Sequence, residues 1–172
     1  MAASGGRGYV VSSATEELLK VIGTALGELY LGGDSSVGWT RALEGLSPGD
    51  AARRPPHLPH SVAQIVAHVQ FWQIKVLGAV QGEAQQGVEQ ASAGWPLPDD
   101  WERLKAEFLE TSAQLRRHCQ NAELLGQSDF RGKPQVVGLM HFAAHSVHHL
   151  GQVITVRQAL DLWPPPGGGD TW

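Results

Sequence analysis

Four segments of the chain repeat their apolar residues every three or four positions, and this helical periodicity limits the possible folds more than any other feature. No segment alternates apolar and polar residues as a half-buried strand does. Amphipathic helices of this length can bury their apolar faces only against one another, so the pattern predicts an all-α four-helix bundle. The predicted helices run from about Ser13 to Leu31, from Ser61 toward Gly82, from Asp99 to about Cys119, and from Pro134 to Leu162.

The connections between these segments are rich in glycine and proline. Ser61 and Gln64 have the spacing of a capping box, which marks the start of the second helix. The first connection spans about 30 residues, too many for a tight hairpin, so we expect a long crossover between helices one and two. Its "WTRALEGL" stretch predicts a helical turn or two, whereas "SPGDAARRPPHLPH" cannot continue a helix. We expect one domain over residues 1–163 and a flexible Pro- and Gly-rich tail over 164–172.

The apolar positions also predict which face of each helix is buried. On a helical wheel the apolar residues of the last helix fall on one side, and His141, His145, His149 and Gln152 fall roughly opposite. The histidines are therefore expected to line a cleft that solvent can enter. The predicted buried positions are Val136, Met140, Ala143, Val147, Leu150 and Ile154 on the last helix, and Leu18, Ile22, Ala25, Leu26 and Leu29 on the first.

Charge and composition narrow the partners and the location. The net charge of −4 gives no broad basic surface, so nucleic acid is not an expected partner. No apolar run approaches the roughly 18 residues that a membrane span needs, and the first residues lack the apolar core of a secretory signal. The single cysteine, Cys119, is expected to be a core residue rather than a nucleophile. These features predict a soluble, cytoplasmic protein without a membrane partner.

The stretch "HFAAHSVHHLGQV", residues 141–153, holds four of the eight histidines. His145 and His149 are four residues apart on a helix, so their rings lie one above the other at a spacing that lets both bind one metal ion. Two imidazoles leave a divalent ion underbound, so a third ligand is needed. His68, in the middle of the apolar stretch "IVAHVQFW", is the best candidate. The alternative is that His68 is a core histidine hydrogen-bonded to a neighbour.

Two stretches, "HSVAQIVAHVQFW" and, some seventy residues later, "GLMHFAAHSVHHLGQV", resemble the DinB/YfiT family of metalloenzymes. That family combines one histidine in the second helix with an HxxxH motif in the last helix, ending HHxGQ. The resemblance covers nearly the whole chain and implies a four-helix bundle with up-down-down-up connectivity. Carried over position by position, it implies that His68, His145 and His149 bind a divalent metal. Many members have arginine in the terminal motif where this chain has Leu150.

Three neutral nitrogen ligands leave at least one coordination position for water or substrate, as in catalytic rather than structural sites. Zinc is the expected ion, with nickel, iron, cobalt or manganese as alternatives. Such an ion lowers the pKa of a bound thiol or water toward neutral pH. Some family members resemble S-transferases and isomerases that use small bacterial thiols. The resemblance therefore implies a metal-dependent transferase whose small-molecule substrates include a low-molecular-weight thiol.

Two other functions stay open, and no catalytic residue is assigned. One is a metal-dependent hydrolase, which the sequence favours less because no Asp or Glu lies between Val136 and Leu160 to act as a general base. The other is a non-catalytic module that binds metal or a small ligand in a stress response, as the damage-inducible family name suggests.

The remaining polar and aromatic residues give weaker expectations. Gln64, His141 and Gln152 lie one turn from predicted ligands and are candidates to orient the imidazoles or bound water. Six tryptophans are more than one small core readily hides, so we expect a homodimer. These are Trp39, Trp72, Trp95, Trp101, Trp163 and Trp172. The histidines expected at the surface are His57, His60 and His118, and His148 is expected to meet solvent or a neighbouring helix.

Overall fold

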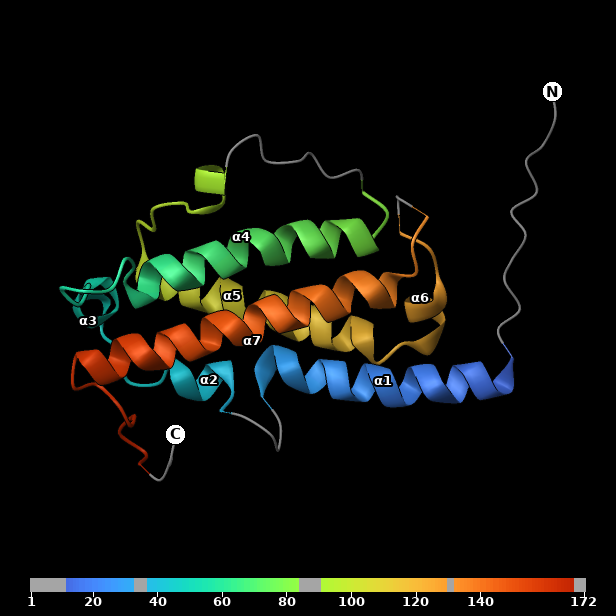
Figure 1. The fold of residues 1–172 in the computed structure, drawn as a ribbon, viewed down its shortest axis with the longest axis horizontal. Helices are drawn as coiled ribbons and strands as arrows, with labels where there is room; N and C mark the ends of the chain where they lie inside the picture. Colours follow the sequence, from blue (N-terminus) through green and yellow to red (C-terminus); the bar gives the residue numbers. More distant parts are fainter. Residues whose placement is uncertain (1–11, 33–36, 84–90, 130–131, 169–172) are drawn as a thin grey trace.

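The computed structural model describes residues 12–32, 37–83, 91–129 and 132–168. Within these ranges the chain is helical and forms no strand, which confirms the all-α prediction. Four long helices lie side by side along the molecule (Figure 1). They are α1 (Ser13–Leu31), α4 (Val62–Val80), α5 (Trp101–Cys119) and α7 (Gln135–Ala159). The last helix ends three residues earlier than predicted, at Ala159 rather than Leu162.

The order of the helices gives the predicted up-down-down-up bundle. Helix α1 packs against α5 and α7, and α4 packs against the same two helices. Helices α1 and α7 run in one direction, whereas α4 and α5 run in the other (Figure 1). Because α4 and α5 are parallel neighbours, the connection between them must return over the length of α4, about 28 Å for its 19 residues. This second crossover carries the short 3-10 helix η1 (Ala91–Gly94) alongside α4.

Three short helices complete the described chain. The predicted turn in the first crossover is α2 (Trp39–Ala42). The proline-rich stretch after it contains α3 (Pro48–Ala52), which was not predicted from the sequence. A proline in the first turn of a helix needs no partner for a missing N–H, so this stretch starts a new helix although it cannot continue one. The third, α6 (Ala122–Gly126), precedes α7 and was also not predicted.

The start of α4 is fixed by the predicted capping box. The Ser61 hydroxyl accepts from the backbone N–H of Gln64 at 3.3 Å, and the Gln64 side chain accepts from the backbone N–H of Ser61 at 3.0 Å. Both bonds satisfy donors that a helix start otherwise leaves free. The cap therefore sets the register of α4 and places His68 nearly two turns into the helix.

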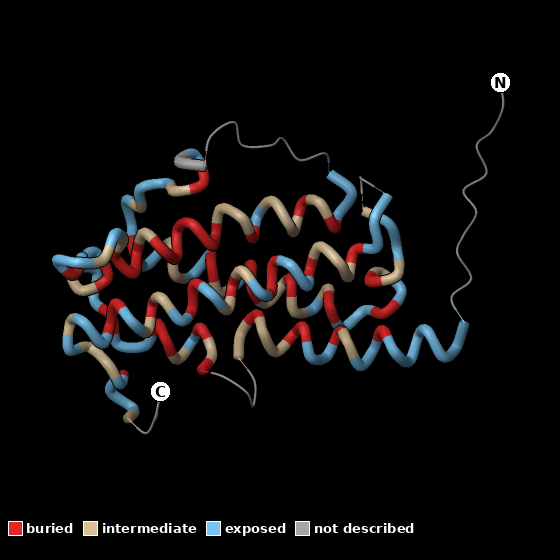
Figure 2. Tube along the Cα trace, in the orientation of Figure 1, coloured by how far each residue is buried: buried red, intermediate tan, exposed pale blue. Residues whose placement is uncertain are grey.

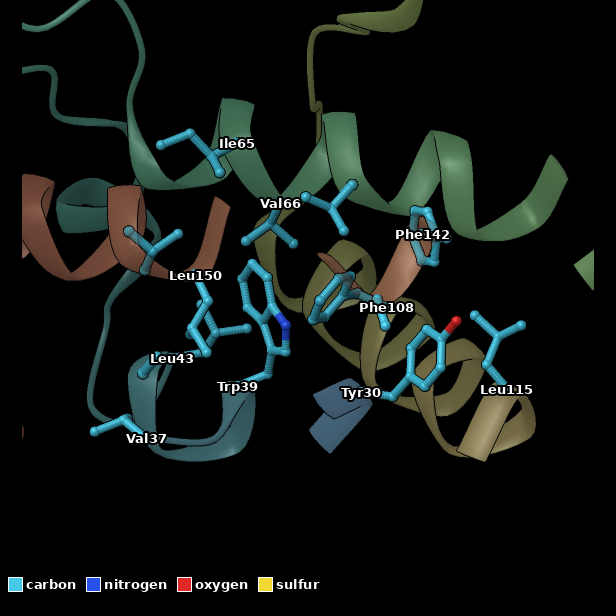
Figure 3. Packing of buried hydrophobic residues seen from close by; sticks show 14 of the residues in the cluster. Tyr30, Val37, Trp39, Leu43, Ile65, Val66, Phe108, Leu115, Phe142 and Leu150 are labelled. Carbon is cyan, nitrogen blue, oxygen red and sulfur yellow. The ribbon is translucent and has the colours of Figure 1, made fainter. Parts of the chain in front are cut away.

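The core is centred on Trp39, which α2 inserts between the long helices (Figure 3). Its indole lies edge-on to Phe108 with ring centroids 4.7 Å apart, and its Nε1–H donates to the Ser146 hydroxyl at 3.0 Å. Nearby, the Tyr30 hydroxyl donates to the carbonyl of Leu139 at 2.9 Å. These two bonds satisfy buried polar groups and tie the first third of the chain to α7.

The buried faces of α1 and α7 differ from the predicted ones (Figure 2). Met140 and Leu18, both expected in the core, are 49% and 58% exposed. Two features explain the difference on α7. Helices α4 and α1 cover it from two sides, and its buried polar residues Ser146 and His149 have hydrogen-bond partners. Burial on this helix therefore does not follow apolar character alone. The buried residues are Gln135, Leu139, Phe142, Ala143, Ser146, His149, Leu150, Val153, Val156 and Arg157 on α7, and Leu19, Gly23, Leu26, Gly27 and Tyr30 on α1.

The described tryptophans do not provide the exposed aromatic surface from which a homodimer was expected. Trp39 and Trp101 are buried, and Trp72, Trp95 and Trp163 are half-buried. Trp172 lies outside the described residues. One bundle therefore accommodates all five, and this argument for a dimer loses its basis. Cys119 is buried, as expected of a core residue, and burial raises the pKa of its thiol to about 12.

Part of the tail predicted to be flexible is described and contacts the first crossover. Pro165 is buried, and the Arg41 guanidinium donates to the carbonyl of Gly168. Residues 169–172 lie outside the described part of the chain, and the flexibility of the tail stays a prediction. None of the described helices combines the length and apolarity needed to cross a membrane.

Candidate metal centre

Three imidazoles from two neighbouring helices meet at one point. His68 comes from α4, and His145 and His149 come from successive turns of α7. The Nε2 atom of His145 lies 3.3 Å from Nε2 of His68 and 3.1 Å from Nε2 of His149. Each ring offers one nitrogen within 4.8 Å of the other two. The structure thus brings together the three histidines that the sequence singled out.

Backbone and side-chain carbonyls set the tautomers of two of these rings. Nδ1 of His68 lies 2.5 Å from the carbonyl oxygen of Gly94, and Nδ1 of His149 lies 2.7 Å from Oε1 of Gln152. A carbonyl oxygen only accepts, so each Nδ1 carries the proton and each Nε2 presents a lone pair. The Gln152 amide nitrogen lies 3.2 Å from Nε2 of His148, which supports this orientation of the carboxamide.

The geometry and the donor set both fit a divalent metal ion. Three nitrogens bound at about 2.1 Å to a tetrahedral ion are about 3.4 Å apart, close to the separations observed around His145. The lone pairs of His68 and His149 face a common point, where they repel each other unless a cation or a proton lies between them. Nδ1 of His145, in contrast to those of the other two rings, is buried without a hydrogen-bond acceptor among the described residues, so the fit rests on the three Nε2 atoms. The three histidines could therefore hold one metal ion.

Burial keeps these imidazoles in the neutral form that metal binding requires. His68 and His149 are only 7% and 5% exposed. Burial lowers the pKa of His68, and burial together with the nearby His68 and His148 lowers the pKa of His145. The pKa of His149 falls furthest, to about 4, with burial as the largest cause. At neutral pH all three rings are therefore uncharged.

The second crossover covers His68 with an aromatic ring. Trp95 stacks on His68 with centroids 3.9 Å apart and planes 12° from parallel, and it stacks on His60 at 3.8 Å and 14°. Two rings cannot share one indole face at that spacing, so Trp95 lies between them. His60, which was expected at the surface, is thus half-buried in a stack. The loop passes so close to α4 that a Cβ on Gly94 would lie 3.3 Å from Nε1 of Trp72.

The other polar residues singled out by sequence have different positions. Gln152 contacts His149 directly, whereas the Gln64 carboxamide caps α4 at Ser61, so its expected contact with a ligand is replaced by the helix cap. His141 is exposed one turn before His145. Contrary to expectation, His118 is half-buried and its Nε2 lies 2.7 Å from Oε1 of Gln135. His57 and His148 are exposed as expected.

A cavity of about 530 Å³ opens beside the histidines, between α4 and α7. It reaches His68 and His145, and the exposed His141 is also on its lining, which connects the site to solvent. Sequence patterns had not indicated Trp95, Gly94 or Asp129 near this site. The first two lie in a glycine-rich connection without periodicity, and only the crossover brings them over α4. The remaining lining residues are Trp72, Val76, Ala79, Val80, Trp95, Asp129, Gln135, Gly138 and Phe142.

Fold and site together define a four-helix bundle with a three-histidine candidate metal centre. The family model of the DinB superfamily matches residues 38–153, well over half of the chain and including all three histidines. The chain therefore belongs to the DinB superfamily. No curated protein matches it, and no solved structure matches it.

Proposed function

We propose that this protein binds a divalent metal ion, zinc by preference, through His68, His145 and His149 and is a metal-dependent transferase acting on a small thiol. The observation that carries the proposal is the convergence of three neutral Nε2 atoms at the end of a cavity large enough for a small molecule. Three nitrogens leave a further coordination position, as catalytic rather than structural sites do. When bound, the ion would act as a Lewis acid that lowers the pKa of a thiol or water.

The chain's own residues supply orientation and exclusion of water. The Gly94 carbonyl and the Gln152 carboxamide hold the two Nδ1 protons, so His68 and His149 cannot rotate their lone pairs away without losing a hydrogen bond. Trp95 covers one face of His68, which limits the approach of solvent to the side of the cavity. A substrate entering through the cavity would reach His145, the ring between the other two.

The position of the nearest cavity-lining carboxylate favours the transferase over the hydrolase. Asp129 accepts from the backbone N–H of Lys133, just before the start of α7 at Gln135. From Gln135 to His145 the helix rises about 15 Å, so the Asp129 carboxylate, which precedes Gln135, is less well placed than His141 to act as a general base at the histidines. His141, one turn from His145 on the cavity lining, is the residue that we propose to move protons.

Metal analysis of protein purified without a nickel column tests the site. We expect about one equivalent of zinc in the native protein and a loss of that zinc in His145→Ala, while the far-ultraviolet circular dichroism stays helical. His57→Ala, an exposed histidine away from the cavity, is the matched control and should keep its zinc. Zinc retained by His145→Ala would contradict the assignment.

Adding a small thiol to cobalt-loaded protein tests the chemistry. We expect a new near-ultraviolet charge-transfer absorption in the native protein, because the histidines leave a coordination position free. The spectrum of cobalt-treated His145→Ala should not respond. If thiols and simple anions leave the spectrum of the cobalt-loaded native protein unchanged, the result would instead support a non-catalytic module that binds metal in a stress response.

A cytoplasmic location and a homodimer complete the proposal. Composition supports the location, since the chain has one cysteine and no long apolar run. The dimer is supported only by the tendency of bundles of this family to pair. Light scattering over a range of concentrations tests the dimer, and a constant monomer mass would refute it.

A further inference from the structure

We propose that the cavity between α4 and α7 binds the apolar body of an elongated, amphipathic substrate whose polar head lies at the three histidines. The placement of the head group rests on the proposed function. The apolar body rests on the shape and the walls of the cavity alone.

The cavity is a groove that follows the two helices. On α4, lining residues recur once per turn from His68 through Trp72 and Val76 to Val80, which spans about 18 Å along the helix axis. At the far end the Gln135 side chain of α7 donates to the carbonyl of Val80 at 3.0 Å, so the two helices are joined there by a hydrogen bond. The groove therefore has His68 and His145 at one end and a polar crosslink at the other.

Apart from His141 on α7, the walls between these ends are apolar. They carry the rings of Trp72 and Phe142 and the side chains of Val76 and Val80, and Gly138 adds no side chain. A thiol built from sugar or peptide units would leave hydroxyls and amides without partners against these walls, which costs free energy for each unpaired group. An alkyl or aryl chain has no such cost and gains by leaving water. The groove thus fits a molecule that is polar at its head and apolar along its body.

A series of n-alkyl hydroxamates with two to eight carbons tests the groove. Hydroxamates bind zinc, so on the zinc-loaded protein the head is anchored while the chain length varies. We expect the dissociation constant to fall about fourfold for each added methylene, as for a methylene moved from water into an apolar site. A dissociation constant that does not change with chain length would overturn the proposal.

Gly138→Leu fills the groove without replacing a histidine. It should abolish the chain-length dependence while the two-carbon hydroxamate binds as to the native protein. Ala159→Leu, on an exposed position at the end of the same helix, is the matched control and should keep the dependence. If Gly138→Leu does not fold, Ala79→Leu on the opposite wall provides the same test. If a folded Gly138→Leu or Ala79→Leu protein shows the same dependence of the dissociation constant on chain length as the native protein, the groove is not the binding site.

Metal-free protein separates this inference from the proposed function. Linear 1-alkanols lack a metal-binding head, and their binding can be followed by the fluorescence of Trp72 and Trp95, which line the groove. Length-dependent alkanol binding that Gly138→Leu removes would support the groove even if zinc does not bind, and only the proposed function would then fail. Zinc binding without any length dependence for hydroxamates or alkanols would overturn the groove and leave the metal centre standing.

Discussion

Trp95 lies flat against His68, with ring centroids 3.9 Å apart and planes 12° from parallel. The contact follows from the connectivity of the bundle. Parallel α4 and α5 force their connection back along α4, and the same connection supplies the Gly94 carbonyl that accepts from Nδ1 of His68. Two consecutive residues therefore orient His68: Gly94 accepts its Nδ1 proton, and Trp95 covers one face of its ring.

Replacing this indole should weaken metal binding without unfolding the bundle. We expect Trp95→Ala to raise the zinc dissociation constant about tenfold, because His68 loses the ring that fixes its plane and water gains access to it. Competition with a chromophoric chelator measures the constant. Trp95→Phe keeps an aromatic face and should recover most of the affinity. Equal affinities for Trp95→Ala and the native protein would show that the Gly94 hydrogen bond alone orients the ring.

Local sequence signals predicted the parts of the fold that depend on local chemistry. The capping box at Ser61 marks the start of α4 within one residue, because it satisfies backbone groups that only a helix start leaves free. His145 and His149 could be paired from their spacing, since a helix places residues four apart on one face. His68 could be singled out from its apolar surroundings, but only the family resemblance favoured a ligand over a core histidine, because nothing local links α4 to α7.

Long-range packing could not be predicted in the same way. The wheel for α7 placed Met140 in the core, although the surrounding helices leave it half exposed and bury Ser146 and His149 instead. Both polar residues are buried because distant or neighbouring groups, Trp39 and Gln152, form hydrogen bonds with them. Apolar periodicity contains no information about such partners.

The two glutamines near the site should respond differently to substitution. Gln152→Ala should weaken zinc binding about tenfold, because Nδ1 of His149 loses its acceptor. Gln152→Glu keeps an acceptor at that position and should retain zinc. Gln64→Ala removes half of a capping box and should lower the free energy of unfolding by about 0.5–1 kcal/mol with unchanged zinc affinity. A loss of zinc in Gln64→Ala would restore the ligand-orienting role first expected for it.

Two glycines of α1 should respond oppositely to alanine. A Cβ on Gly23 would overlap the backbone carbonyl of Cys119, where α1 crosses α5, so Gly23→Ala should lower the free energy of unfolding by about 1–3 kcal/mol. A Cβ on Gly27 would lie 3.2 Å from the Cγ of Arg116, whose side chain can shift, and 3.7 Å from the Arg116 carbonyl oxygen, which is an ordinary contact. Gly27→Ala should therefore be neutral or stabilising, since alanine favours the helix. Urea unfolding measures both, and equal effects would contradict this close approach of α1 and α5.

The buried imidazole of His149 should make the metal-free bundle less stable in acid. Burial lowers its pKa from 6.5 to about 4, so between these values the unfolded chain binds a proton that the folded chain does not. Above pH 6.5 the group does not reduce the free energy of unfolding. As the pH falls from 6.5 toward 4, the free energy of unfolding decreases by about 1.4 kcal/mol per pH unit for one such group. The pKa values of His68 and His145 are lowered too, which acts in the same direction. Urea unfolding with a chelator at pH 7, 6 and 5 gives the slope, and His149→Gln, which cannot titrate, should reduce it. A variant slope equal to the native one would show that His149 does not cause the acid sensitivity.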